Sequence, residues 1–110
     1  MEYILKDFAE KAAAAKASDI FLIAGAPPMM RLHGKIANLG DFPVLAPEDT
    51  QELAYSIMSH EQISRFERRH ELDLAFQIDG LARFRVNIYQ QRNSIGLVLR
   101  IIPLSIYSLD

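Results

Sequence analysis

Residues 80–100 read GLARFRVNIYQQRNSIGLVLR and predict two β-strands joined by a polar loop at 90–94. In residues 81–89 apolar and polar side chains alternate, which is the pattern of a strand with one buried face. The side chains expected in the core are Ala82, Phe84, Val86 and Ile88. Those expected on the opposite face are Arg83, Arg85, Asn87 and Tyr89.

The flanking segments extend this pattern into a sheet. Residues 72–78 alternate in the same way, and Asp79-Gly80 is a signal for a two-residue hairpin turn. Residues 95–101 predict a third strand whose polar side carries Arg100. The C-terminal part is therefore expected to form a three-stranded antiparallel meander.

The N-terminal part predicts helices and shorter strands. A helix is expected over residues 3–16, with Ile4, Phe8, Ala12 and Ala15 on its apolar stripe, followed by strands at 19–23 and 29–36. The second of these should turn or bulge at Gly34. After a loop at 39–46, one helix starts at Pro47 and another at the Ser59-x-x-Gln62 capping box. The predicted fold class is α+β, a mostly antiparallel sheet of roughly five to six strands with helices on one side.

The composition excludes several classes of function. The chain has 110 residues, 50% of them hydrophobic and 24% charged, which suits one globular domain. A net charge of −2 gives no general attraction to nucleic acid, and the lack of cysteine excludes disulfides and thiolate chemistry. No stretch approaches the ~20 apolar residues of a membrane span. Charged residues interrupt the N-terminal segment as they would not in a signal peptide, so a cytoplasmic protein is expected.

The sequence contains no catalytic or metal-binding motif. Gly34-Lys35 is followed by Ile36 and lacks the glycine-rich loop of a phosphate-binding motif. The three histidines have no metalloprotease spacing, so no metal site is expected. We therefore expect no catalytic residue in this chain and no enzyme activity from it alone.

The arginines of the predicted meander require an explanation. Arg83 and Arg85 should lie about 7 Å apart along one strand, with Arg100 on the next. Like charges held together need carboxylate partners or an external anion. One interpretation is a solvated sheet face whose arginines pair with nearby acids; the candidates are Glu67, Glu71 and Asp73. The other is a phosphate site, because a guanidinium group donates two parallel hydrogen bonds and stays charged.

Longer motifs carry a resemblance to a known family. The stretch ASDIFLIAGAPPMMRLHGKI at 17–36 resembles the A-S-D…G-x-P-P…R-x-(D/N)-G signature of pilus-retraction ATPases, the twitching-motility motors of the type II/IV secretion ATPase superfamily. Segments 45–67, 71–87 and 90–103 match the same family in order. Phe21 and His33 depart from the signature, where the family usually has His and an Asp or Asn. The superfamily also includes a retraction-ATPase paralogue and assembly ATPases.

The resemblance implies that residues 1–103 form an N-terminal PAS-like domain and that 104–110 begin a linker to a RecA-like ATPase domain outside this sequence. It implies a homohexamer on the cytoplasmic side of the inner membrane that works with the pilus machinery and does not bind nucleic acid. ATP, with Mg, would be held by the ATPase domain. Arg85 and Arg100 match family arginines that reach nucleotide phosphates, with Arg83 as an addition. The alternatives are a stand-alone PAS-like ligand sensor or a protein-interaction module.

Overall fold

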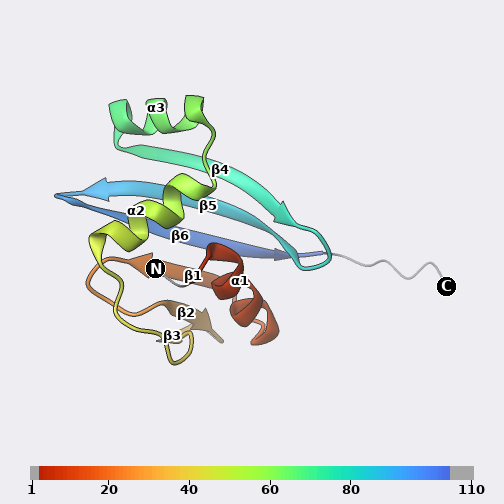
Figure 1. Cartoon of the computed structure of the whole chain (residues 1–110). Helices are drawn as coiled ribbons and strands as arrows, with labels where there is room; N and C mark the ends of the chain where they lie inside the picture. Colours follow the sequence, from red (N-terminus) through yellow and green to blue (C-terminus); the bar gives the residue numbers. More distant parts are fainter. Residues whose placement is uncertain (1–2, 105–110) are drawn as a thin grey trace.

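The computed structural model describes residues 3–104 as three helices and six strands (Figure 1). The elements in chain order are α1 (Leu5–Ala14), β1 (Asp19–Ile23), β2 (Met29–Leu32), β3 (Lys35–Asn38), α2 (Pro47–Ser56), α3 (His60–Arg69), β4 (Glu71–Ile78), β5 (Ala82–Gln91) and β6 (Ser94–Pro103). The strands form one sheet in the order β3-β2-β1-β6-β5-β4, with every neighbouring pair antiparallel. The predicted α+β class and the C-terminal meander are confirmed.

The segment predicted as one strand over 29–36 is two strands, β2 and β3. They form a hairpin in which Leu32 pairs with Lys35 around the two-residue turn His33-Gly34. Both turn residues have positive φ, 52° and 81°. Tight hairpin turns require this left-handed backbone because it follows the twist of the strands. The turn expected at Gly34 is present, but it reverses the chain and so divides the predicted single strand into two.

The prediction of a two-residue hairpin at Asp79-Gly80 is wrong by one residue. Ile78 pairs with Ala82, so the loop holds residues 79–81, and Leu81 N–H donates to the Ile78 carbonyl at 3.0 Å. Side chains alternate with a period of two, and even-numbered residues are apolar on both strands. A two-residue loop would pair even with odd positions and put one apolar set in water.

The β5–β6 connection is shorter than the predicted loop at 90–94. Gln91 pairs with Ser94, and the turn is Arg92-Asn93. Arg92 has φ 60° and serves this turn, away from the other arginines of the meander.

The helices begin and end close to the predicted residues. α1 is shorter than 3–16, and Ile4, expected on its buried stripe, is the N-cap and is 61% exposed. The side chain of Asp7 accepts the Ile4 N–H at 2.7 Å, which satisfies a free donor of the first turn. The predicted capping box of α3 is confirmed: Ser59 Oγ accepts the Gln62 N–H at 3.2 Å, and Gln62 Oε1 accepts the Ser59 N–H at 2.9 Å.

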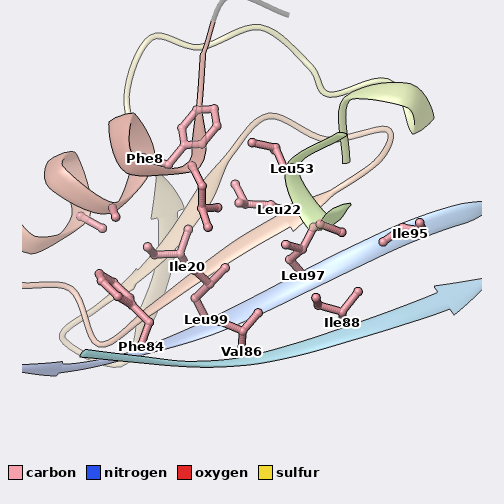
Figure 2. Close-up of a cluster of buried hydrophobic side chains, with 14 of the residues drawn as sticks. Phe8, Ile20, Leu22, Leu53, Phe84, Val86, Ile88, Ile95, Leu97 and Leu99 are labelled. Atoms are coloured by element: carbon pink, nitrogen blue, oxygen red, sulfur yellow. The ribbon is translucent and has the colours of Figure 1, made fainter. Parts of the chain in front are cut away.

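The core lies between the helices and one face of the sheet, as Figure 2 shows for α1, α2 and the central strands. The fully buried apolar side chains include Phe8, Ile20, Leu22, Leu53, Phe84, Ile88, Leu97 and Leu99. Each such side chain contributes roughly 1.5–3 kcal/mol by leaving water. This packing occupies the inner face of the sheet. No helix of residues 3–104 covers the centre of the opposite face, which we call the outer face.

Residues 105–110 fall outside the described range, so most of the segment predicted as a linker does too. Within residues 3–104, no helix is long and apolar enough to cross a membrane.

Candidate functional site

A row of charged residues crosses the outer face of the sheet. Strand pairing aligns Arg31 of β2 with Asp19 of β1, Asp19 with Arg100 of β6, and Arg100 with Arg85 of β5. Ala75 of β4 continues the row at the edge. Three arginines and one aspartate thus lie side by side on consecutive strands. We call these four residues the charge row.

The charge row borders a shallow cleft of about 500 Å³. The residues that line it are Asp19, Asp73, Leu74, Ala75, Arg85, Val86, Asn87, Val98 and Arg100. The cleft thus lies on the outer face over β1, β6, β5 and β4. Arg85 and Arg100, both predicted as phosphate-contacting residues, are among these residues.

Asp19 is the nearly buried member of the charge row. Its side chain is 10% exposed, and its Oδ1 lies 3.5 Å from Arg100 Nε. Its Oδ2 lies 3.4 Å from Arg31 Nε and accepts the Ser18 hydroxyl at 2.7 Å. Sequence reasoning missed this residue as part of the site. The signal was present, since one acid opens the otherwise apolar strand DIFLI.

Arg31 forms the far end of the charge row. Besides its contact with Asp19, its guanidinium carbon lies 5.4 Å from the centre of the Phe21 ring, the geometry of a cation–π contact. Two residues of β1, Asp19 and Phe21, therefore hold the Arg31 side chain, and Arg31 does not line the cleft.

Arg85 has a different environment. Its side chain is exposed, it forms no ion pair with any residue of the range 3–104, and Arg100 stands directly opposite on β6. Like charges at opposed positions of neighbouring strands repel one another. The arrangement leaves a positive side chain facing a shared open volume, which is the condition for capturing an external anion.

The acids that were predicted as local partners of the arginines contact other groups. The side-chain amide of Asn87 donates hydrogen bonds to both carboxylates, from Nδ2 to Glu71 Oε2 at 3.0 Å and to Asp73 Oδ1 at 2.8 Å. Glu67 accepts the Tyr55 hydroxyl at 2.9 Å. Burial and this contact raise the pKa of Tyr55, burial having the larger effect. The expected pairing with Glu67, Glu71 or Asp73 is therefore not found among the described residues, and Asp19 is the acid that meets Arg100.

Arg83 does not join Arg85 and Arg100. It is exposed on the same face but lies between Gln77 and Ile102, closer to the β4–β5 loop, and does not line the cleft. The structure therefore brings together two of the three predicted phosphate-contacting residues. Their role toward a nucleotide stays a prediction.

The site suits a phosphate group better than a metal ion. Two guanidinium groups on adjacent strands can each donate hydrogen bonds to phosphate oxygens. Within residues 3–104 no group of three or more His, Asp or Glu side chains is placed to hold a metal ion. The side chains at the cleft are therefore suited to bind an anion such as a phosphate group.

Comparison with known proteins gives consistent relatives, although no family model matches the chain. The chain is 39% identical over 93 residues to the type IV pilus ATPase PilU of Pseudomonas aeruginosa. This alignment covers 84% of the chain and 24% of PilU. The chain is 38% identical over 94 residues to the pilus retraction ATPase PilT of the same organism, covering 86% of the chain and 27% of PilT. The chain thus spans about a quarter of the length of these relatives.

A solved structure agrees with these relatives. The crystal structure of the pilus retraction motor PilT with bound ADP superposes with a TM-score of 0.87 at 43% identity. The match covers 96% of this chain and 31% of that one. Sequence and fold therefore point to the same group of proteins.

Proposed function

Because this chain belongs to the family of PilT- and PilU-type pilus retraction ATPases and corresponds to their N-terminal region, we propose that it is a nucleotide-sensing and ring-assembly domain of a hexameric ATPase. The assembled motor would power retraction of a type IV pilus. The domain would be PAS-like, cover residues 1–103, and lead through 104–110 to the ATPase domain. In this proposal Arg85 and Arg100 contact phosphates of ATP that the ATPase domain holds together with Mg²⁺.

The observation that carries this proposal is the exposed arginine pair at the cleft. Arg85 meets no acid among the described residues and stands opposite a second arginine. Opposed like charges repel each other, and although Asp19 contacts Arg100, Arg85 has no such acid, so an external anion is the partner that would stabilise the pair. A guanidinium group brought to a γ-phosphate neutralises the charge that develops during phosphoryl transfer. The relative with bound ADP supports nucleotide as the source of that phosphate.

The remaining parts of the proposal follow from the family. The partners would be the ATPase domain of the same chain, neighbouring subunits of a homohexamer, and the inner-membrane part of the pilus machinery. The protein would act in the cytoplasm, peripheral to the inner membrane. ATP hydrolysis would be coupled to pilus disassembly, and the N-terminal domain would move as a rigid unit with the state of the nucleotide.

The test is the substitution Arg85→Ala in the full-length protein. We expect ATP turnover to fall at least about tenfold, because the lost group acts on the charge of the transition state. Nucleotide should still bind, since the phosphate-binding loop lies in the other domain. The matched control is Arg68→Ala, which removes an exposed arginine of α3 that forms no ion pair within residues 3–104.

Wild-type turnover in Arg85→Ala would remove Arg85 from the mechanism. Oligomer size, measured by light scattering on the same variants, separates phosphate contact from ring assembly. If Arg85→Ala loses the hexamer and its turnover together, the arginine meets acids of a neighbouring subunit, and the site is a protein-interaction surface.

A further inference from the structure

Asp19 occupies an unusual place for a carboxylate. It lies on the outer face of the sheet, yet its side chain is only 10% exposed, and Arg31 of β2 and Arg100 of β6 flank it on the two neighbouring strands. Burying a charge costs free energy unless it is paired and hydrogen-bonded. Both oxygens of Asp19 have partners, and those partners are the guanidinium groups of Arg31 and Arg100 with the hydroxyl of Ser18.

The contact between Asp19 and Arg100 uses one end of the guanidinium group. Asp19 Oδ1 faces Arg100 Nε at 3.5 Å, while the Arg100 side chain is still 73% exposed. An arginine has five N–H donors, four of them on the two terminal nitrogens. A carboxylate held at Nε therefore restricts the side chain and leaves the terminal donors available at the cleft.

The carboxylate itself is fixed from its other side. Ser18 Oγ donates to Asp19 Oδ2 at 2.7 Å, and Arg31 Nε lies 3.4 Å from the same oxygen. Arg31 is in turn held over the Phe21 ring. The orientation of Asp19 thus depends on β1 and β2, which are continuous with the packed sheet.

We propose that Asp19 is a positioning residue for Arg100: it holds the guanidinium group by Nε so that the terminal nitrogens serve a phosphate shared with Arg85. This role rests on the proposed function, in which that phosphate belongs to ATP. Asp19 also lowers the net charge of the charge row from +3, the charge of its three arginines, to +2. Arg85 and Arg100 can then stay opposite each other before the anion arrives.

The test uses the full-length protein and the nearly isosteric substitution Asp19→Asn. A side chain misplaced by about 1 Å can cost as much as 10²-fold in rate, so we expect turnover of ATP to fall about 10- to 100-fold. KM should change little, because the affected contact matters most in the transition state. Glu71→Gln is the matched control, since it makes the same carboxylate-to-amide change on the same face without touching an arginine.

A double-mutant cycle distinguishes positioning from a general effect on folding. If Asp19 acts through Arg100, adding Asp19→Asn to Arg100→Gln causes no further loss of turnover. Independent, multiplying losses would overturn the positioning role. If Asp19→Asn has wild-type turnover while Arg100→Gln is slow, the positioning role of Asp19 would also be wrong. The proposed contact between Arg100 and phosphate would still stand. Full turnover in Arg100→Gln would overturn both.

A second variant keeps the test valid if Asp19→Asn does not fold. Arg100→Lys retains the charge at an exposed position but lacks the fork that contacts Asp19 and a phosphate at once. We expect Arg100→Lys to lose about as much turnover as Asp19→Asn. Full activity of Arg100→Lys would show that a point charge suffices, and the positioning role would be wrong.

Discussion

Tyr89 and Gly96 form a cross-strand pair on the outer face that allows a sharp test of the packing described above. The two residues are directly opposed on β5 and β6. A methyl group built on Gly96 would lie 2.5 Å from both Cζ and Oη of the Tyr89 ring and 2.9 Å from its Cε2. Ordinary contacts between carbon atoms are about 3.5–4 Å long, so the ring would have to move by roughly 1 Å. The substitution Gly96→Ala therefore tests whether the ring covers the glycine.

The expected magnitude combines two opposing effects. Overpacking of a core costs about 1–3 kcal/mol, and about 1–2 kcal/mol is expected here because the clashing atoms are the end of the half-buried Tyr89 side chain. Replacing glycine within a strand recovers roughly 0.5–1 kcal/mol, because glycine loses more conformational freedom on folding. We expect Gly96→Ala to lower the free energy of unfolding by about 0.5–1 kcal/mol. In a Tyr89→Ala background the clash is absent, and the same substitution should be neutral or stabilising.

The assay is urea unfolding of the 110-residue chain for both single variants and the double variant. With a slope of about 1–3 kcal/mol per M urea, the expected loss moves the midpoint by roughly 0.2–1 M. Gly80→Ala is the control, because Gly80 has φ 77° and open space around it, so its cost should not depend on Tyr89. An equal loss for Gly96→Ala in both backgrounds would refute the proposed ring contact.

Two further predictions concern the helices. Ser59→Ala removes the side-chain acceptor of the α3 capping box and should lower the free energy of unfolding by about 1 kcal/mol in urea unfolding. The control is Ser64→Ala, at an exposed position within the helix, and equal losses in the two variants would contradict a capping role. Burial and the contact with Glu67 raise the pKa of Tyr55 above its ordinary value of about 10. The stability that the Tyr55–Glu67 contact contributes should therefore be fully present below about pH 10 and be lost as the pH rises through the pKa of Tyr55 in the folded protein. Unfolding of wild type and Tyr55→Phe between pH 7 and 11 checks this, and a wild-type advantage that grows with pH would show that the sign is wrong.

The sequence predicted the elements whose patterns are local. The alternation in residues 81–89 placed Arg85 on the outer face, and the short connection to β6 brought Arg100 beside it. The same alternation contained the correct β4–β5 register, but the strong Asp79-Gly80 signal favoured a loop one residue too short. A turn or bulge was predicted at Gly34, but residues 29–36 were assigned to one strand because no pattern in so short a segment shows that its two halves pair with each other.

The part of the site that sequence reasoning missed depends on distant pairing. Asp19 meets Arg100 across 81 positions of sequence, and no local period relates them. The acids preferred from the sequence are nearer in the chain: Glu71 and Asp73 lie within the meander, and Glu67 lies in α3 just before it. In the structure the side-chain amide of Asn87 donates hydrogen bonds to Glu71 and Asp73, and alternating strand patterns do not encode such side-chain contacts.

The central position of β1 has a consequence for how the chain acquires its fold. β1 joins the N-terminal hairpin to the meander through β6, which follows the other five described strands in the chain. Loop closure over such a separation is slow, and a high contact order is typical of slowly folding domains. Until β6 arrives, β1 and β5 each present an unpaired edge, which is the surface on which chains aggregate. Nascent chains of this protein should therefore need protection until β6 has emerged from the ribosome.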